Sequence, residues 1–174
     1  MLNQTASVVL VVLLVSAAVL DIRSRRIPNA LTMAGIAAGL ALRLVAGPEA
    51  FIVGLVGILL AFVVMLPFLV LGALGGGDGK LLMALGAFTG ARQLVGALLV
   101  IAMVGGILAV VDAGRKRMLL PVLYNTVGIL SHWATLGRRG ANRSLASAGA
   151  LAVPYGVAIA VGGLLWWFLK AGGL

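Results

Sequence analysis

The sequence predicts an all-α membrane protein with six transmembrane helices, an additional interfacial helix on the cytoplasmic side, and one domain over residues 1–174. Three observations support this fold class. The chain is 63% hydrophobic and only 10% charged, its mean hydropathy is +1.21, and its apolar residues fall into six runs. Because soluble domains carry about 25% charged residues, we expect a compact bundle inside a lipid bilayer.

The six apolar runs are separated by short polar connections, and runs of about 18 residues are typical of spanning helices. The expected spans are 5–20, 30–46, 51–73, 81–91, 94–111 and 150–169. The first run is not expected to be a cleaved signal peptide, because no basic residue precedes it and a basic cluster follows it. We therefore expect a retained first helix.

The fourth apolar run is unusually short. Its eleven residues, at ~1.5 Å each, give roughly 17 Å of helix against ~30 Å of hydrocarbon. Either this helix continues past Arg92, or the preceding glycine-rich turn lies below the headgroups. Irregular backbone at that depth must be shielded by protein or line a wet cavity.

Basic residues are unevenly distributed between the two sides of this topology. The first, third and fifth connections share one side and hold ten of the 13 basic residues: Arg23, Arg25, Arg26, Lys80, Arg115, Lys116, Arg117, Arg138, Arg139 and Arg143. Arg43, Arg92 and Lys170 lie on the opposite side or at helix ends. Because cytoplasmic loops are enriched in Lys and Arg, both termini should face away from the cytoplasm. Topology thus explains the net charge of +9, and no nucleic-acid partner is expected.

The long fifth connection, Asp112 to Ser147, contains a candidate interfacial helix over 121–137. Basic clusters flank this segment, as in a helix anchored to anionic headgroups. Its apolar residues repeat at helical spacing: Leu123, Val127, Leu130 and Ala134. The alternative is a seventh span, which would put the two basic clusters on opposite sides of the membrane. The charge bias favours the interfacial helix.

Two of the four acidic residues predict a chemical site. Glu49 sits in a short outer turn, and Asp112 adjoins a basic cluster, where a surface ion pair is expected. Asp21 ends the first span and Asp78 opens the fourth from the same side, so the topology places both at similar depth. Singly, Asp21 would mark the interface and Asp78 would cap a helix. Together, near hydrocarbon where an ionised group is costly, they indicate function.

A pair of carboxylates suits the acid–base activation of water. Two neighbouring aspartates do not both ionise easily, so they share one proton. The ionised member takes a proton from water as it attacks a peptide carbonyl, and the protonated member donates to the carbonyl oxygen. Arg23, Lys80 and the positive end of the fourth helix favour the ionised member. Such a pair titrates as a unit, so neither residue is assigned a single role.

The glycines before Asp78 are expected to turn the chain tightly and expose backbone. Elsewhere, Gly35-x-x-x-Gly39 and Gly86-x-x-x-Gly90 fit either close helix contacts or ordinary membrane-helix filler. A phosphate loop is not expected, because Leu74 occupies its first glycine position and Leu81 stands where Ser or Thr is required. With one histidine, His132, and no cysteine, neither a metal site nor a cofactor is expected.

Three motifs resemble those of the type IV prepilin peptidases, membrane aspartic proteases of the GxGD class. The first is D-x-R-x-x-x-I-P-N, formed by Asp21, Arg23, Ile27, Pro28 and Asn29. The second is G-x-G-D-x-K, formed by Gly75, Gly77, Asp78 and Lys80. The third, weaker motif is the P-Y-G-x-A segment within the run from Val153 to Gly163. The resemblance covers nearly the whole chain.

The resemblance implies six spans and a catalytic pair, Asp21 and Asp78. It implies substrate-binding or site-shaping roles for the neighbouring motif residues Arg23, Pro28, Asn29, Gly75, Gly77 and Lys80. The implied reaction is cleavage of a short basic leader from a pilin-like precursor. The implied place is the cytoplasmic face of the bacterial inner membrane.

The chain departs from the larger members of that family. Those members methylate the new N-terminus and carry a cytoplasmic region with paired cysteines between spans one and two. Here the first connection is only DIRSRRIPN and there is no cysteine, so methylation is not expected. The compact form resembles the prepilin peptidases of tight-adherence pilus systems, and archaeal-type preflagellin peptidases are a similar alternative.

Two other classes of protein compete with the protease. A small proton- or cation-coupled transporter would use Asp21 and Asp78 as ligands, but transporters usually place such groups near the midplane of repeated, interrupted helices. No repeat is evident here. A non-catalytic subunit of a secretion or pilus assembly machine would tolerate Asp→Asn changes. The oligomeric state is not predicted.

The orientation can be tested by labelling. Residues of the Asp112–Ser147 connection should react with a membrane-impermeant reagent from the cytoplasmic side only, because that connection holds much of the positive charge. Labelling of Arg138 from the outside would contradict the six-span topology.

Overall fold

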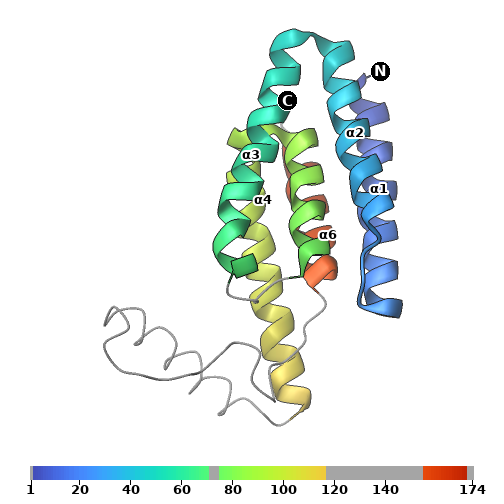
Figure 1. Ribbon diagram of the computed structural model, residues 1–174. Helices are drawn as coiled ribbons and strands as arrows, with labels where there is room; N and C mark the ends of the chain where they lie inside the picture. The colour runs from blue at the N-terminus through green and yellow to red at the C-terminus, as the bar shows by residue number, and fades with distance from the viewer. Residues whose placement is uncertain (1, 71–74, 117–154, 172–174) are drawn as a thin grey trace.

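The computed structural model describes residues 2–70, 75–116 and 155–171, which form the helices of Figure 1. In chain order these helices are α1 (Leu2–Ser24), α2 (Asn29–Ala46), α3 (Pro48–Val70), α4 (Gly76–Arg115) and α6 (Tyr155–Ala171). Among them, α1 to α4 are long and apolar enough to cross a membrane, and α6 is a shorter apolar helix. An all-α membrane protein is thus confirmed. The predicted interfacial helix lies outside the described residues.

Helices α1 and α6 run antiparallel along one side of the bundle. At one end, Trp167 Nε1 donates a hydrogen bond to Ser7 Oγ at 2.9 Å. At the other end, Gly156 lies against Asp21. The start of α1 and the end of α6 therefore lie at the same end of the bundle (Figure 1), as the predicted topology requires.

A single glycine joins α2 to α3. Gly47 has φ 128°, a backbone conformation that residues other than glycine rarely adopt. Its N–H donates to the carbonyl of Arg43 at 3.1 Å. Pro48 follows as the first residue of α3, where its missing N–H costs nothing. This glycine–proline pair produces the tight antiparallel hairpin seen in Figure 1.

Helix α4 consists of two arms that double back on each other. Gly90 has φ 72° and ψ 167°, which is not helical. Before it, the first arm (residues 76–89) runs antiparallel to α3, with Gly79 against Leu69 and Gly86 against Gly57. After it, the second arm (residues 91–115) runs antiparallel to α6, with Gly105 against Tyr155. Figure 1 shows the reversal.

The reversal corrects two expected boundaries. The fourth span was expected to end at Ala91, with a turn at Arg92 and Gln93, yet the turn lies at Gly90, because only glycine adopts its positive φ without strain. At the other end, α4 begins at Gly76, so the first arm is longer than the predicted run. Asp78 therefore lies inside the first helical turn.

The first arm of α4 forms the centre of the bundle. Every residue from Leu81 to Gly90 is buried except the half-buried Met83. Its side chains join one apolar core with residues of the surrounding helices, including Leu10, Leu14, Ala61, Leu94, Ile101 and Ile159. A helix that is apolar on all faces is expected in such a central position.

Arg43 of α2 caps the buried reversal of α4. A helix end leaves its last carbonyls without intrahelical donors. Arg43 donates from Nε to the Ala87 carbonyl at 2.8 Å and from Nη2 to the Phe88 carbonyl at 2.7 Å. A third bond runs from Nη1 to the Ala50 carbonyl of α3 at 3.2 Å. The guanidinium thus satisfies backbone that lipid would leave unpaired and complements the negative end of the helix.

Close helix contacts account for the predicted glycine pairs. A Cβ at Gly35 would lie 2.5 Å from a Leu13 methyl of α1, and one at Gly39 would lie 2.9 Å from Ala87 Cβ of α4. A Cβ at Gly86 would lie 2.5 Å from the Gly57 carbonyl oxygen. These distances confirm the packing interpretation for Gly35, Gly39 and Gly86, whereas Gly90 forms the reversal of α4.

Basic residues gather at the end of the bundle opposite the start of α1 and the end of α6. Arg23, Arg25 and Arg26 follow Asp21 there, and Arg115 and Lys116 end the second arm of α4. Asp112 and Lys116 form an ion pair of 2.7 Å, one helical turn apart. This confirms the predicted surface pair, which contributes little to stability.

Replacing the capping arginine should destabilise the bundle. Arg43→Met removes the Arg43 donors of the Ala87 and Phe88 carbonyls, and at about 1–3 kcal/mol per orphaned group we expect a loss of about 2–6 kcal/mol. Thermal unfolding in lipid-like micelles measures this loss. Arg43→Lys, which has no planar fork, should recover only part of it. The exposed Arg92 provides the control: equal stability of Arg43→Met and Arg92→Met would contradict the capping role.

Candidate active site

Asp21 lies near the end of α1 in an enclosed position. Its side chain is only 6% exposed, and Oδ2 is buried with no hydrogen-bond partner among the described residues. Buried polar atoms are nearly always paired, and each exception requires an explanation. An unpaired carboxylate oxygen at the edge of an apolar bundle is costly, so Asp21 is a strong candidate for function.

The connection from α1 to α2 folds back over Asp21. Arg25 adopts a left-handed conformation, φ 51°, and its N–H donates to the Asp21 carbonyl at 2.8 Å, which ends α1. Pro28, with φ −61° and ψ 136°, then provides the N-cap position of α2. Between them, Ile27 turns inward and is only 8% exposed. The D-x-R-x-x-x-I-P-N motif therefore forms a helix end, a buried hydrophobic anchor and a helix start.

Asp78 occupies the third position of α4. Its Oδ2 accepts a hydrogen bond from the N–H of Gly75, the N-cap residue, at 3.3 Å. The N–H groups of Asp78 and Gly79 both donate to the Gly75 carbonyl, at 3.1 and 3.3 Å. The expectation of a tight glycine turn is wrong for Gly76 and Gly77, because both belong to this first helical turn.

Both aspartates lie next to residues that pack on Ile27: Asp21 contacts Gly156, and Asp78 follows Gly77. Asp21 lies in the last turn of its own helix, α1, whose negative end disfavours a carboxylate, but both aspartates also lie at the N-terminus of a helix. Asp78 is in the first turn of α4, and Asp21 adjoins the first turn of α6 at Gly156. Helix N-termini favour negative charge, which partly offsets the mutual repulsion of the two aspartates in an apolar setting.

A hydrogen bond links the first two motifs directly. Lys80 Nζ donates to Asn29 Oδ1 at 2.9 Å. Asn29 begins α2 and Lys80 lies in the second turn of α4, so this bond fixes the α1–α2 connection against the start of α4. The predicted site-shaping residues Pro28, Asn29, Gly75 and Lys80 therefore all lie at the same end of the bundle as the aspartates.

Two glycines allow the site to close around Ile27. A Cβ at Gly77 would lie 3.2 Å from both the Cβ and the carbonyl oxygen of Ile27. A Cβ at Gly156 would lie 2.9 Å from Ile27 Cδ1 and 2.7 Å from Asp21 Oδ2. Ile27 thus separates the first turn of α4 from the first turn of α6, and all three motifs meet at this point.

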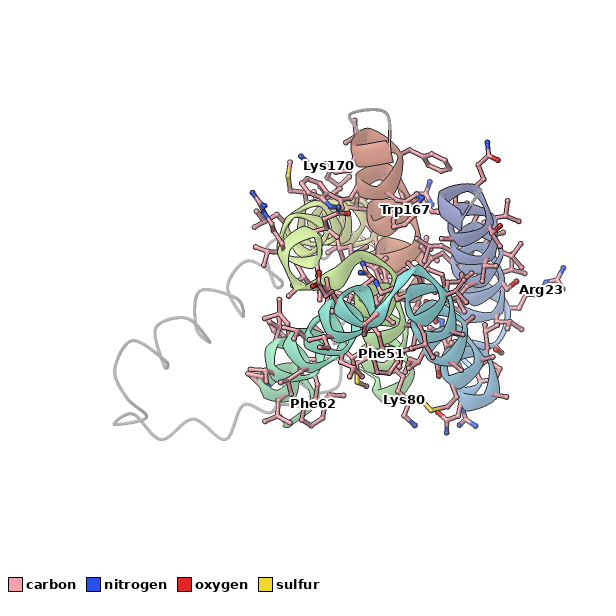
Figure 2. All side chains as sticks on the ribbon, turned by 90° about the horizontal axis from the view of Figure 1, so that it is seen from above. Arg23, Phe51, Phe62, Lys80, Trp167 and Lys170 are labelled. Atoms are coloured by element: carbon pink, nitrogen blue, oxygen red, sulfur yellow. The ribbon has the colours of Figure 1, made fainter. Side chains whose placement is uncertain are left out.

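Arg23 is the one predicted site residue that the structure does not bring to the aspartates. It follows Asp21 by two positions, about 200° around the helix, and its side chain is exposed. Figure 2 shows Arg23 on the outer side of α1, pointing away from the bundle. Lys80 of α4, the other predicted cation, donates to Asn29.

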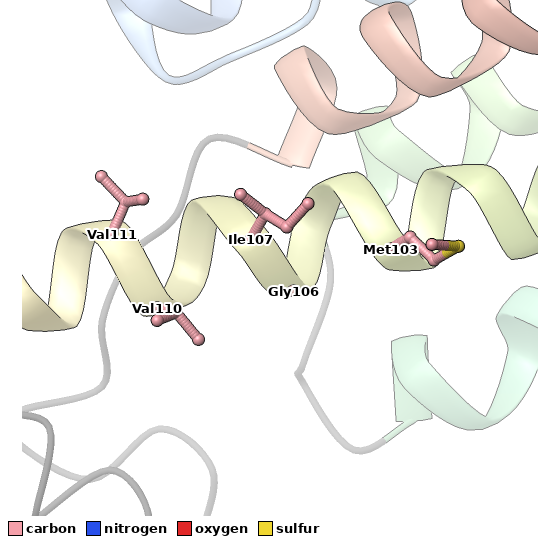
Figure 3. A pocket seen from close by; sticks show the side chains of 5 residues that line it. All are labelled: Met103, Gly106, Ile107, Val110 and Val111. Atoms are coloured by element: carbon pink, nitrogen blue, oxygen red, sulfur yellow. The ribbon is translucent and has the colours of Figure 1, made fainter.

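A surface hollow on the second arm of α4 does not compete with this site. The described part of the chain holds no group of three or more His, Cys, Asp or Glu side chains. The hollow is lined only by nonionisable residues: Met103, Gly106, Ile107, Val110 and Val111 (Figure 3). It has no group that can activate water.

Sequence reasoning missed the roles of Ile27 and Gly156. Both stood inside the quoted motifs, so the signal was present. The sequence pattern alone did not reveal that Gly156 packs against Asp21, which lies far from it along the chain.

Comparison with known proteins identifies a matching family. A sequence model described as the type IV leader peptidase family matches residues 8–110. That span includes both aspartates and most of the helices α1 to α4. Neither the curated proteins nor the solved structures give a significant match.

The link between Lys80 and Asn29 should appear as an energetic coupling. Lys80→Met and Asn29→Ala each remove the same bond, so the double variant should be about 1 kcal/mol more stable than the sum of the single losses predicts. Thermal unfolding of the four proteins gives this coupling. The exposed Arg23 supplies the control, because Arg23→Ala and Asn29→Ala should add. An additive result for Lys80 and Asn29 would contradict the link.

Proposed function

The chain belongs to the type IV leader peptidase family, which consists of aspartic prepilin peptidases, and from this premise we propose that Asp21 and Asp78 form its catalytic pair. The reaction is hydrolysis of the peptide bond that joins a short basic leader to a pilin-like precursor. One observation carries the proposal: the buried Asp21 carboxylate has an unpaired oxygen beside Ile27, which also packs on Gly77, the residue before Asp78.

The pair works with one shared proton. The ionised carboxylate accepts a proton from water as the water oxygen bonds to the peptide carbonyl carbon, and the protonated carboxyl donates its proton to the carbonyl oxygen. The tetrahedral intermediate then returns that proton as its C–O double bond re-forms, and the departing nitrogen takes the proton that came from water. The new carboxyl and amino termini leave, and the pair regains its single proton.

The residues around the two aspartates mainly hold them in position and contribute little charge. Lys80 is engaged with Asn29, and Gly75 donates its N–H to Asp78. Asp21 Oδ2 receives no such bond among the described residues, so this oxygen is the natural contact for the hydrolytic water. Groups held by packing and by hydrogen bonds lose little freedom on reaching the reactive geometry.

The proposed topology has six spans, with the active site facing the cytoplasm of a bacterial inner membrane. The two arms of α4 would be separate spans, because the chain reverses at Gly90. Loops one, three and five then carry the positive charge inward. The basic segment between Asp112 and Ser147 would bind anionic headgroups.

The precursor would enter from the lipid as a helix, leaving its leader junction at the depth of the aspartates. A helix shields its own backbone, so the scissile peptide must first become extended, and a glycine beside the cut would ease this change. The basic inner face of the enzyme does not attract a basic leader. Recognition would therefore depend on hydrophobic contact and geometry, and the compact chain would cleave without methylating.

Cleavage of a reconstituted precursor tests the catalytic pair. Asp21→Asn and Asp78→Asn should each lower the cleavage rate by about 10²-fold or more, because each removes a group that must carry or release a proton. Both variants should insert into the membrane and unfold at the wild-type temperature, since the amide preserves the shape of the side chain.

Asp112→Asn is the matched control. Asp112 pairs with Lys116 at the exposed end of α4, so this change should leave cleavage intact. Wild-type processing by either Asp21→Asn or Asp78→Asn would end the two-carboxylate mechanism. Processing by both would favour a non-catalytic assembly subunit.

A further inference from the structure

Each aspartate of the proposed pair packs against its own glycine. Of the described glycines, two have a carboxylate oxygen as the nearest neighbour of an added Cβ: Gly75 faces Asp78 Oδ2 at 3.2 Å, and Gly156 faces Asp21 Oδ2 at 2.7 Å. Gly75 is three residues from Asp78, so its contact is a local consequence of the helix start. Gly156 lies on a different helix, so its contact depends on the tertiary structure.

Asp21 and Ile27 leave no room for a side chain at Gly156. An added Cβ would lie 2.7 Å from Asp21 Oδ2, 2.9 Å from Ile27 Cδ1 and 3.0 Å from Asp21 Cβ. Ile27 Cδ1 ends a flexible side chain and can move aside. Asp21 Cβ is fixed by the backbone of α1, so a methyl group at 156 displaces either the Asp21 carboxylate or α6 itself.

The other close glycines of α6 meet different atoms. A Cβ at Gly162 would lie 2.7 Å from the backbone of Ile101, and one at Gly163 would lie 3.2 Å from a Leu85 methyl. These two glycines serve helix packing against α4. Gly156 differs because the atom it accommodates is an ionisable group with an unpaired oxygen.

We propose that Gly156 is a positioning residue for Asp21: the missing side chain creates the space that holds the Asp21 carboxylate beside the first turn of α6 and directs it toward Asp78. The catalytic part of this inference rests on the proposed function. The geometric part concerns only the contact between Gly156 and Asp21. The third motif thereby becomes part of the active site, although the family match ends at residue 110.

Cleavage kinetics of Gly156→Ala test the catalytic part. A methyl group that rotates the Asp21 carboxylate should lower kcat by about 10-fold or more, because misplacement by about 1 Å is enough to cost 10²-fold. KM should change little, since Gly156 faces Asp21 and Ile27 instead of the lipid from which the precursor enters. Wild-type kcat in Gly156→Ala would overturn the inference.

Two further glycines serve as controls. Gly106→Ala adds a methyl group with nothing within 4 Å and should leave kcat unchanged. Gly162→Ala disturbs the packing of α6 on Ile101 without touching a carboxylate, so it should lower thermal stability while the folded fraction keeps its kcat. An equal loss of kcat in Gly162→Ala and Gly156→Ala would reduce Gly156 to a packing role and overturn the inference.

A double-mutant cycle with Asp21→Ala tests the geometric part without relying on activity. If the added methyl group clashes with Oδ2, Gly156→Ala should lower Tm in the wild-type background and lower it less in the Asp21→Ala background, which keeps only the 3.0 Å contact with the Cβ of residue 21. Should Gly156→Ala fail to fold, recovery of folded protein in the double variant is the equivalent readout. Equal losses in both backgrounds, or no recovery, would overturn the inference.

The cycle also separates this inference from the proposed function. If Asp21→Asn still cleaves the precursor, the catalytic pair is wrong, yet a positive cycle would still establish the contact. If Asp21→Asn is inactive and the cycle is additive, the pair stands and Gly156 does not position it.

Discussion

Holding two acidic side chains together at the edge of an apolar bundle is the constraint on which this structure depends. Their charges repel each other, and neither hydrocarbon nor buried protein offers the solvation of water. Packing at three points opposes this repulsion. Gly77 and Gly156 let α4 and α6 close on Ile27, and Lys80 binds Asn29. These contacts favour glycine, because an added Cβ would lie 3.2 Å from Ile27 at position 77 and 2.7 Å from Asp21 Oδ2 at position 156.

The far end of the bundle contributes to the same arrangement through Arg43. The first arm of α4 is short for a membrane span, and it ends at a reversal enclosed by α2 and α3. Three hydrogen bonds from one guanidinium satisfy the backbone there. An arginine placed among apolar helices thus has a structural role, since backbone carbonyls are the partners that such a charge requires. Because the central arm is fixed at this end, its other end holds Asp78 at a defined depth.

The sequence predicted much of this protein because long apolar runs and isolated charges in membrane proteins have few interpretations. The spans 30–46 and 51–73 closely match α2 and α3, and Asp21 and Asp78 were identified from their positions at helix ends. The turn at Gly90 was missed, because a glycine in an apolar run does not reveal its φ. The outward direction of Arg23 and the contact of Gly156 were also missed, since each depends on how the helices are rotated against one another.

Cross-linking between the two aspartate positions tests the central claim most directly. The chain has no cysteine, so Asp21→Cys and Asp78→Cys can be combined without background and treated in membranes with a short bifunctional thiol reagent. The account predicts efficient intramolecular cross-linking of this pair, and little when Arg23→Cys replaces Asp21→Cys, because Arg23 lies on the outer face of α1. Failure of the 21–78 pair to cross-link, or equal cross-linking of the 23–78 pair, would contradict it.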